Sequence, residues 1–363
     1  MYRIQKAIFL FLLCSFYSQI IHAQENVIPR LIWKVNKVDF GSLLEEEGAK
    51  IAEFEFTHTQ DSLFYIDQVI TDCGCTTVDY SKDTLSVGGT GKLLVSFDPS
   101  STAGFFSRMI VVKGNLFGSQ DTLYIEGTSI PFPDNPDLAY PRKEGALGFR
   151  LPKVNLGEVL TNGPKVKQVE LYNFGSDPIQ RKDLIYTGPE YIKVFQHEEM
   201  IYPNQRGLLD VVYDAVLKED LGFSEDQVLL TWSGEKAARL DVIANVFEYF
   251  PPISKEQLNQ VPQLSISTPE IDLKEISANS IQNKTVTLTN KGREVLEIRK
   301  IQGNCDCLVL EIAKTSINPG ESIDLKITFD PKGRKGIDQR NIYIFSTDPL
   351  NSVQLLVLKS RVE

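Results

Sequence analysis

The sequence predicts an all-β protein made of three tandem copies of one sandwich-forming unit, and two observations support this. First, residues 91–99 (G-K-L-L-V-S-F-D-P) match residues 323–331 (I-D-L-K-I-T-F-D-P) at an offset of 232. Second, half of that offset, 116, carries residues 37–41 (K-V-D-F-G) onto residues 153–157 (K-V-N-L-G). Each copy therefore has the length of one small domain.

Within each copy the side-chain pattern predicts β-strands. Residues 52–57 (A-E-F-E-F-T), 166–172 (V-K-Q-V-E-L-Y) and 284–289 (K-T-V-T-L-T) alternate between apolar and polar side chains, which is the period of a half-buried strand. N-F-G at 173–175 and N-K-G at 290–292 follow two of these runs and indicate turns, because Asn and Gly adopt positive φ at low cost. About seven such strands in roughly 100 residues are typical of an immunoglobulin-like sandwich.

The repeat also sets the expected domain boundaries. We expect a signal peptide at 1–23, an immunoglobulin-like domain with a C-x-C pair at 27–131, one without a pair at 142–249, and a third with a pair at 263–363. Residues 130–141 and 250–262 lie between the copies and are rich in proline, which favours extended, stiff linkers.

The N-terminal residues are typical of an export signal. Arg3 and Lys6 precede an apolar run at 7–16, and Ala23 offers a small residue at a cleavage point. The run is far shorter than the roughly 20 residues that span a bilayer, and no later stretch is apolar enough, so we expect no membrane span. Cys14 should be removed with the signal. Export predicts a location in the periplasm or at the cell surface, where disulfides can form.

The charge of the chain argues against nucleic acid as a partner. The formal net charge is −10, and loss of Arg3 and Lys6 with the signal makes it −12. An acidic chain is repelled by phosphate backbones and by anionic lipid surfaces. We therefore expect other proteins of the cell envelope as partners, bound through strand edges and end loops.

The four remaining cysteines form two C-x-C pairs, Cys73 with Cys75 and Cys305 with Cys307, related by the offset of 232. On a strand, residues i and i+2 have Cα atoms about 6.6 Å apart, at the outer edge of the range of about 4.4 to 6.8 Å that a disulfide tolerates. A kink at Gly74 would close the gap. Such a bond closes almost no loop and should stabilise the fold weakly, so a redox role is more natural for it than a stapling role.

Two other interpretations of the pairs stay open. Two thiolates suit a soft ion such as Cu(I), and the first copy could add His58 or Asp72, whereas residues 251–363 contain no histidine. A zinc site needs four ligands and would require both pairs to meet, which stiff linkers oppose. Alternatively, the cysteines are small apolar residues packed under a loop. The pairs are therefore candidates for a disulfide, a metal site of unknown metal, or structural thiols.

The sequence offers no catalytic residue and implies no cofactor. The chain after the signal has two histidines, His58 and His197, and no motif places either beside a nucleophile. Asp98, Asp214 and Asp330 recur at matching places, but a calcium site needs about six oxygens and no acidic cluster recurs beside them. We expect these carboxylates to form turns with their own backbone.

Taken together, these motifs resemble the bacterial domain of unknown function 1573. The first copy has C-G-C-T at 73–76, a glycine turn at Gly88, F-D-P at 97–99 and Gly104. The third copy adds N-P-G-E at 318–321, F-D-P-K-G-R-K-G at 329–336 and I-Y-I-F-S-T-D-P at 342–349. The second copy instead resembles the immunoglobulin-like domains of ciliary and centrosomal proteins, through L-G-E-V-L at 156–160 and L-Y-N-F-G-S-D-P-I at 171–179.

The resemblance implies an immunoglobulin-like fold in an exported bacterial protein, and no assigned activity. The third copy departs from the pattern with C-D-C-L, and the second has Pro189 and Tyr191 where the offset would place cysteines. Two hypotheses follow. The first is a non-enzymatic interaction or structural module of the envelope. The second is an envelope thiol-redox or copper-handling protein that uses the C-x-C pairs.

Overall fold

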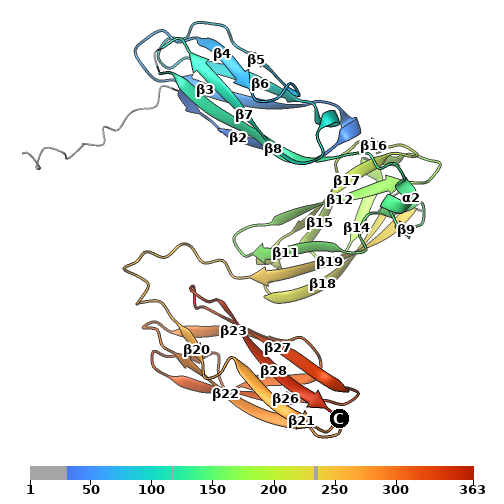
Figure 1. Ribbon diagram of the computed structural model, residues 1–363, viewed down its shortest axis with the longest axis vertical. Coiled ribbons are helices and arrows are strands. Elements are labelled where there is room, and N and C mark those ends of the chain that lie inside the picture. The colour runs from blue at the N-terminus through green and yellow to red at the C-terminus, as the bar shows by residue number, and fades with distance from the viewer. Residues whose placement is uncertain (1–30, 117, 233–235) are drawn as a thin grey trace, which may run out of the picture. The chain divides into compact units, whose positions relative to one another are not determined.

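The computed structural model describes residues 31–116, 118–232 and 236–363 (Figure 1). The expected signal peptide at 1–23, with Cys14, lies outside the described residues. Across these ranges the chain is almost entirely strand, and its two α-helices, α2 (Pro136–Ala139) and α3 (Ala215–Lys218), are one turn each. The predicted all-β fold with sheets arranged as sandwiches is confirmed. No helix in the described ranges is long and apolar enough to cross a bilayer.

The contacts divide the chain into two units at Asp134, and the first unit is one sandwich. One sheet has the order β1 (Leu31–Trp33), β3 (Lys50–His58), β6 (Thr90–Phe97), β5 (Thr76–Tyr80). The other has the order β2 (Lys37–Leu44), β8 (Gln120–Ile130), β7 (Gly104–Gly114), β4 (Ile66–Thr71). Phe54 and Phe97 from one sheet and Ile110 from the other are fully buried between them. We call this sandwich 1.

The second unit, from Asn135 to Glu363, contains two sandwiches. In sandwich 2 the sheets are β15 (Ile192–Gln196), β17 (Arg206–Tyr213), β12 (Lys165–Asn173), β10 (Leu147–Phe149), β9 (Arg142–Glu144), and β11 (Val154–Leu160), β19 (Lys236–Phe247), β18 (Gly222–Trp232), β14 (Leu184–Thr187), with a small pair β13 (Ile179–Gln180) and β16 (Met200–Ile201). In sandwich 3 they are β20 (Leu264–Ile266), β22 (Gln282–Asn290), β26 (Ser322–Phe329), β24 (Leu308–Ile312), and β21 (Glu270–Ile276), β28 (Val353–Val362), β27 (Gly336–Ser346), β23 (Leu296–Gly303), β25 (Ser316–Ile317). The buried residues of the two sandwiches form separate clusters.

Sandwiches 1 and 3 share a strand order, as the offset of 232 predicts. In each of the three copies an early strand also pairs in parallel with the last one: β2 with β8, β11 with β19, and β21 with β28. All three pairings shift register at one bulge, after Asp39, Asn155 and Asp272. The repeated D/N-x-G of the sequence is this bulge, because the side-chain oxygen of Asp39 accepts the Gly41 N–H at 2.8 Å.

The third copy forms the same bulge without glycine. Lys274 takes the glycine position with φ of 62°, close to the 65° of Gly157, and its N–H donates to Asp272 at 2.9 Å. A residue with a Cβ is strained in this left-handed region. The constant feature of the bulge is therefore the hydrogen bond that the side-chain oxygen of the Asp or Asn accepts. The glycine of the first two copies serves to avoid backbone strain at positive φ.

The first proline-rich segment is more ordered than a simple spacer. Its second half forms α2, and Tyr140, which follows α2, is fully buried against Tyr172 with ring centroids 5.2 Å apart. The Tyr140 hydroxyl donates to Glu170, which also pairs with the buried Arg206 at 2.9 Å. Burial is the main cause that raises the pKa of Tyr140 above its usual value. The end of this linker is thus anchored on sandwich 2.

Candidate functional site

Both C-x-C pairs lie in tight turns that lead from one sheet of a sandwich to the other. Cys73 and Cys75 lie between β4 and β5, and Cys305 and Cys307 lie between β23 and β24. The straight-strand spacing of about 6.6 Å therefore does not apply to these cysteines. The chain must change sheets at this point, so it leaves the extended conformation just where the cysteines occur.

This turn brings the two cysteines of each pair closer than a strand would. In both pairs the Cα atoms are 5.2 Å apart and the sulfur atoms are joined in a disulfide. The kink does not depend on Gly74, because a Cβ added there would meet nothing within 4 Å. In addition, the third copy has Asp306 in place of this glycine, and the Cα atoms of Cys305 and Cys307 are still 5.2 Å apart.

The F-D-P motif holds this turn in place. The backbone N–H of Asp98 donates to the carbonyl of Cys75 at 3.0 Å, and that of Asp330 donates to the carbonyl of Cys307 at 2.9 Å. The two motifs are far apart in the sequence but form one structural element, because β5 and β24 pair with the strands that end at F-D-P.

The aspartates of these motifs form turns, as expected. The carboxylate of Asp98 accepts the N–H of Ser100 at 3.0 Å, and this hydrogen bond lowers the pKa of Asp98. Asp214 accepts from Val216 at 3.0 Å and Asp330 accepts from Lys332 at 3.0 Å. Each carboxylate thus stabilises the backbone that follows its strand.

Sandwich 2 forms the same turn without any cysteine. The N–H of Ile192 donates to Pro189 at 3.0 Å, and the N–H of Asp214 donates to Tyr191 at 2.8 Å. In place of a disulfide, the Tyr191 hydroxyl donates to Asp226 at 2.7 Å and accepts from Lys218 at 3.0 Å. Burial raises the pKa of Tyr191. The fold therefore makes this turn with or without a disulfide.

The two sulfur atoms of each pair have different surroundings. All four cysteines are half-buried, but only Cys75 and Cys307 pack against the hydrophobic cores of their sandwiches. In the first copy the N–H of Cys75 also donates to the sulfur of Cys73 at 3.0 Å. The first cysteine of each pair is thus the outer one and the second the inner one.

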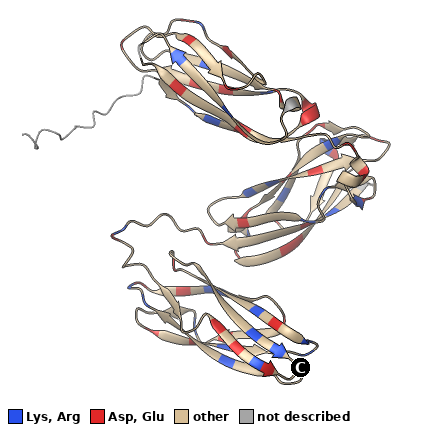
Figure 2. Cartoon of the chain, viewed as in Figure 1, with Lys and Arg blue, Asp and Glu red and all other residues tan. Residues whose placement is uncertain are grey.

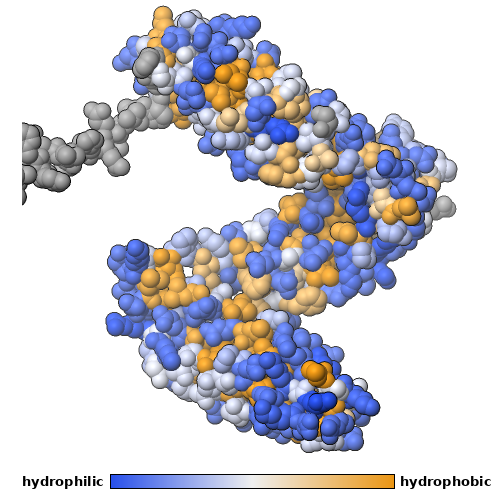
Figure 3. Space-filling view, viewed as in Figure 1, coloured by the Kyte–Doolittle hydropathy of each residue, from blue (hydrophilic) through white to orange (hydrophobic). Residues whose placement is uncertain are grey.

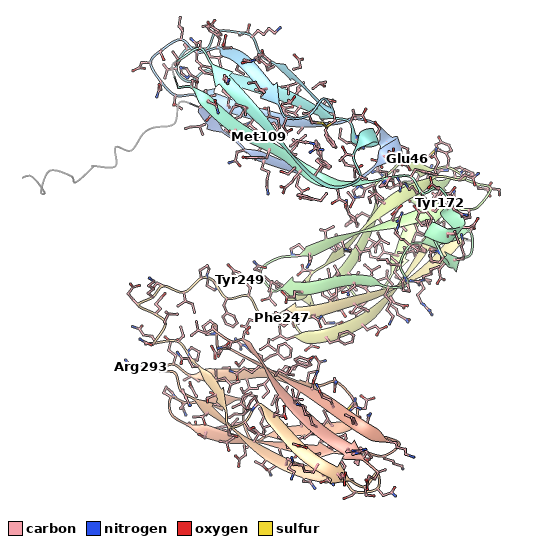
Figure 4. All side chains as sticks on the ribbon, in the orientation of Figure 1. Glu46, Met109, Tyr172, Phe247, Tyr249 and Arg293 are labelled. Atoms are coloured by element: carbon pink, nitrogen blue, oxygen red, sulfur yellow. A yellow bond between two sulfur atoms is a disulfide. The ribbon has the colours of Figure 1, made fainter. Side chains whose placement is uncertain are left out.

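Cys305 also lines a pocket of about 620 Å³ in the second unit. Its walls come from β23, β27, β28 and the cysteine turn of sandwich 3 and from β18 and β19 of sandwich 2. The side chain of Gln302 connects the two sandwiches at this pocket. It accepts a hydrogen bond from the Phe223 N–H at 2.9 Å and donates one to the Phe223 carbonyl at 3.2 Å. Phe247, labelled in Figure 4, faces Phe345 with ring centroids 6.3 Å apart.

Ion pairs reinforce the contact between sandwiches 2 and 3. Lys300 of β23 donates to the carboxylate of Asp220 at 2.8 Å and to the carbonyl of Leu221 at 2.7 Å. Arg299 pairs with Glu248 at 2.9 Å. Sequence reasoning missed this contact and the pocket. Neither has a local motif, because the residues come from five strands and from turns in two copies.

The suggested metal ligand His58 lies far from the cysteines. Thr76, the residue after Cys75, lies level with Lys50 at the start of β3, because both residues pair with Phe97. His58 is eight residues farther along β3 than Lys50, which is a distance of about 26 Å. His58 is buried, stacks on Phe64 at 5.3 Å and contacts the carbonyl of Ser62 at 2.6 Å. The idea that it joins Cys73 and Cys75 in a copper site is wrong.

His58 instead occupies a structural position of the repeat. At the matching place in sandwich 3, the buried Asn290 donates to the carbonyls of Glu294 at 2.7 Å and Ile317 at 2.9 Å. Asp72, the other suggested ligand, lies beside Cys73 but accepts the Met109 N–H at 3.1 Å. Among the described residues, no three His, Cys, Asp or Glu side chains are grouped as a metal site would need.

Comparison with known proteins identifies two of the copies. A family model described as "Protein of unknown function (DUF1573)" matches residues 31–129 and 264–362, the copies that contain the C-x-C pairs. The resemblance inferred from the motifs is therefore confirmed. No curated protein matches.

Several solved structures are similar to this chain. One is a protein of unknown function from Porphyromonas gingivalis W83, with a TM-score of 0.45 and 15% identity over 60% of this chain and 100% of that one. Another is the ASH / PapD-like domain 7 of human CEP192, with a TM-score of 0.25 and 10% identity over 32% of this chain and 93% of that one. A third is the titin segment I67–I69, with a TM-score of 0.20 and 8% identity over 93% and 99% of the two chains.

Proposed function

The chain belongs to DUF1573, a family of unknown function, and on this basis we propose that it is an exported, non-enzymatic protein of the bacterial cell envelope that binds other proteins through the faces of its sandwiches. One observation supports the binding role most directly. The sheet face of sandwich 3 beside the cysteine turn already packs against another domain of the same chain, because Gln302 and Phe345 on it meet Phe223 and Phe247 of sandwich 2.

The matching face of sandwich 1 has the features of a second contact surface. The offset of 232 places Ile70 where sandwich 3 has Gln302, and Met109 where it has Asn341. Ile70, Met109 and Tyr124 are 38%, 40% and 40% exposed, and Met109 lies directly opposite Tyr124 in the β7–β8 pairing. We call Ile70, Met109 and Tyr124 the outer patch.

The charge pattern supports a polypeptide partner. Acidic and basic side chains are interspersed along the strands (Figure 2), and apolar side chains show between them on the visible face of sandwich 1 (Figure 3). Mixed charge around apolar side chains is typical of a protein interface, whereas a phosphate or an anionic lipid selects a basic surface.

Affinity capture from an envelope fraction tests the binding role. Wild-type protein is compared with a Met109→Asp/Tyr124→Asp variant, and with Phe195→Asp as the matched control, because Phe195 is 52% exposed on β15 of sandwich 2. The outer-patch variant should lose captured proteins that the control retains. Recovery of nothing above background, or of the same proteins by all three, would contradict the proposal. Export is tested separately. The mass of the protein from the periplasmic fraction shows whether residues 1–23 have been removed.

A second candidate function is thiol–disulfide chemistry or soft-metal handling at the C-x-C pairs. The observation that favours it is the turn of sandwich 2, which has the same backbone hydrogen bonds without cysteines. A disulfide that the turn does not require can be reduced without loss of the fold, which suits a role in thiol chemistry. Cys→Ser variants of both pairs should then change thiol-redox or copper tolerance of the cells, and normal tolerance of both would oppose this candidate.

A further inference from the structure

We propose that the Cys305–Cys307 disulfide exchanges with the cysteine thiol of an apolar polypeptide segment, and that the incoming sulfur bonds to Cys305. This inference depends on the second candidate function, because it requires that the pair be chemically active. It adds to it the sulfur atom that is attacked and the class of substrate.

The pocket beside Cys305 supplies the binding site. It measures about 620 Å³, enough for two or three side chains, and Cys305 and Asp306 form part of its wall. Its apolar lining comes from both sandwiches and consists of Phe223, Phe247, Tyr343, Phe345 and Val353. Aromatic walls with a few amide groups fit the side chains of an unfolded peptide better than a small hydrophilic molecule.

The asymmetry of the pair identifies the sulfur that is attacked. Cys307 packs against the core cluster that contains Phe329, and its carbonyl accepts the Asp330 N–H at 2.9 Å. Cys305 lines the pocket. A thiol bound in the pocket therefore meets Cys305 first, and Cys307 is the leaving group.

The step is an ordinary thiol–disulfide exchange. The deprotonated substrate sulfur attacks the sulfur of Cys305, a new bond forms between these two atoms, and the Cys305–Cys307 bond breaks. Its electron pair stays on Cys307 as a thiolate, which takes a proton from water. The disulfide of the protein is the oxidant, so one chain accepts one substrate thiol and no other redox partner is needed.

The charge of the turn adds selectivity. Asp306, between the two cysteines, is exposed and is one of the residues that line the pocket. This negative charge disfavours an anionic thiol such as glutathione and favours a neutral or basic peptide. In the first copy Gly74 stands in this position. The Cys73–Cys75 pair is therefore the internal control.

The test uses the full exported chain with one pair at a time. Cys73→Ser/Cys75→Ser leaves the third-copy pair, and Cys305→Ser/Cys307→Ser leaves the first-copy pair. Each is mixed with glutathione or with a capped pentapeptide that has cysteine between two phenylalanines and ends in lysine. Thiolates released during the reaction are alkylated, and mass spectrometry measures the rate of mixed-disulfide formation and the cysteine that is modified.

The third-copy pair should react with the peptide roughly tenfold faster than the first-copy pair, the gain expected from one well-placed aromatic contact. Glutathione should instead react more slowly with the third-copy pair than with the first-copy pair, because of the charge of Asp306. The peptide should be found on Cys305 and the alkyl group on Cys307. Phe247→Ala should remove the preference, whereas Phe195→Ala, a change of an exposed ring away from the pocket, should not.

Other outcomes separate this inference from the second candidate function. If both pairs exchange with both thiols at equal rates, or the peptide is found on Cys307, the pocket has no role and this inference is wrong, while thiol chemistry stands. If neither pair exchanges with any thiol, although dithiothreitol reduces the unfolded chain, this inference fails together with the thiol–disulfide part of the second candidate function. Circular dichroism of each variant before the reaction shows that it is folded.

Discussion

Removal of the Cys73–Cys75 disulfide should destabilise sandwich 1 only slightly. The bond closes a loop of three residues, and the loop-entropy relation for a disulfide then gives about 1.6 kcal/mol at 25 °C, compared with about 3 kcal/mol for a loop of 15 residues. The turn itself should survive, since the Asp98 N–H still holds the Cys75 carbonyl position and sandwich 2 keeps the same geometry without cysteines. We therefore expect Cys73→Ser/Cys75→Ser to fold.

The chain offers a specific probe for this measurement. It has two tryptophans, Trp33 in sandwich 1 and Trp232 in sandwich 2. The ring of Trp33 packs on Phe56 with centroids 4.8 Å apart, so its fluorescence reports on the core of sandwich 1. In a Trp232→Phe background, urea unfolding followed at Trp33 should show the midpoint falling by about 0.5 to 1.5 M when the pair is removed.

A large loss would refute this reasoning. If the double variant lost more than about 4 kcal/mol, or failed to fold, the disulfide would be a structural staple, as in small secreted domains. The argument that the pair is available for chemistry would then fail for this copy. Cys305→Ser/Cys307→Ser should leave the Trp33 transition unchanged and serves as the control.

Three further predictions concern the repeat itself. Asn290→Ala should destabilise sandwich 3 by about 2 to 4 kcal/mol, measured by chemical unfolding, because the carbonyls of Glu294 and Ile317 lose their donor, whereas Asn290→His should lose less because sandwich 1 has histidine there. An equal loss in both would contradict a shared role of His58 and Asn290. Lys274→Gly should raise the stability of sandwich 3 by about 0.5 to 1 kcal/mol by relieving the positive φ, seen as a melting temperature higher by a few degrees, and a lower one would refute the strain argument. Hydrogen bonds from Lys34 and then Lys92 lower the pKa of Glu55 to about 2, so its contribution to stability is present above pH 4.5 and is lost as the pH falls from there toward 2. Unfolding curves of Glu55→Gln across this range should show a weaker pH dependence than the wild type, and identical dependence would count against the ion pairs.

The candidate site could be predicted only in part. The cysteines and the F-D-P motif were visible as repeated letters, and their aspartates were expected to form turns. Their mutual contact was not, because strand pairing brings Asp98 to Cys75 across 23 residues of chain. His58 shows the opposite error. A histidine near two cysteines in sequence suggested a ligand, but the length of β3 places it at the far end of the sheet from the turn.

The sequence by itself determined the class of fold, the number of copies and the family, because alternating side chains and a fixed offset depend only on the order of residues. It also determined that the pairs are limited to copies one and three. Only the tertiary structure decided that the cysteines lie in turns between sheets and that Cys305 borders a pocket and Cys307 a core. It also decided that the side chain of Gln302 forms hydrogen bonds with the backbone of Phe223. These features arise from residues of different strands and copies. Their contact is set by how the sheets pack, so no local pattern encodes it.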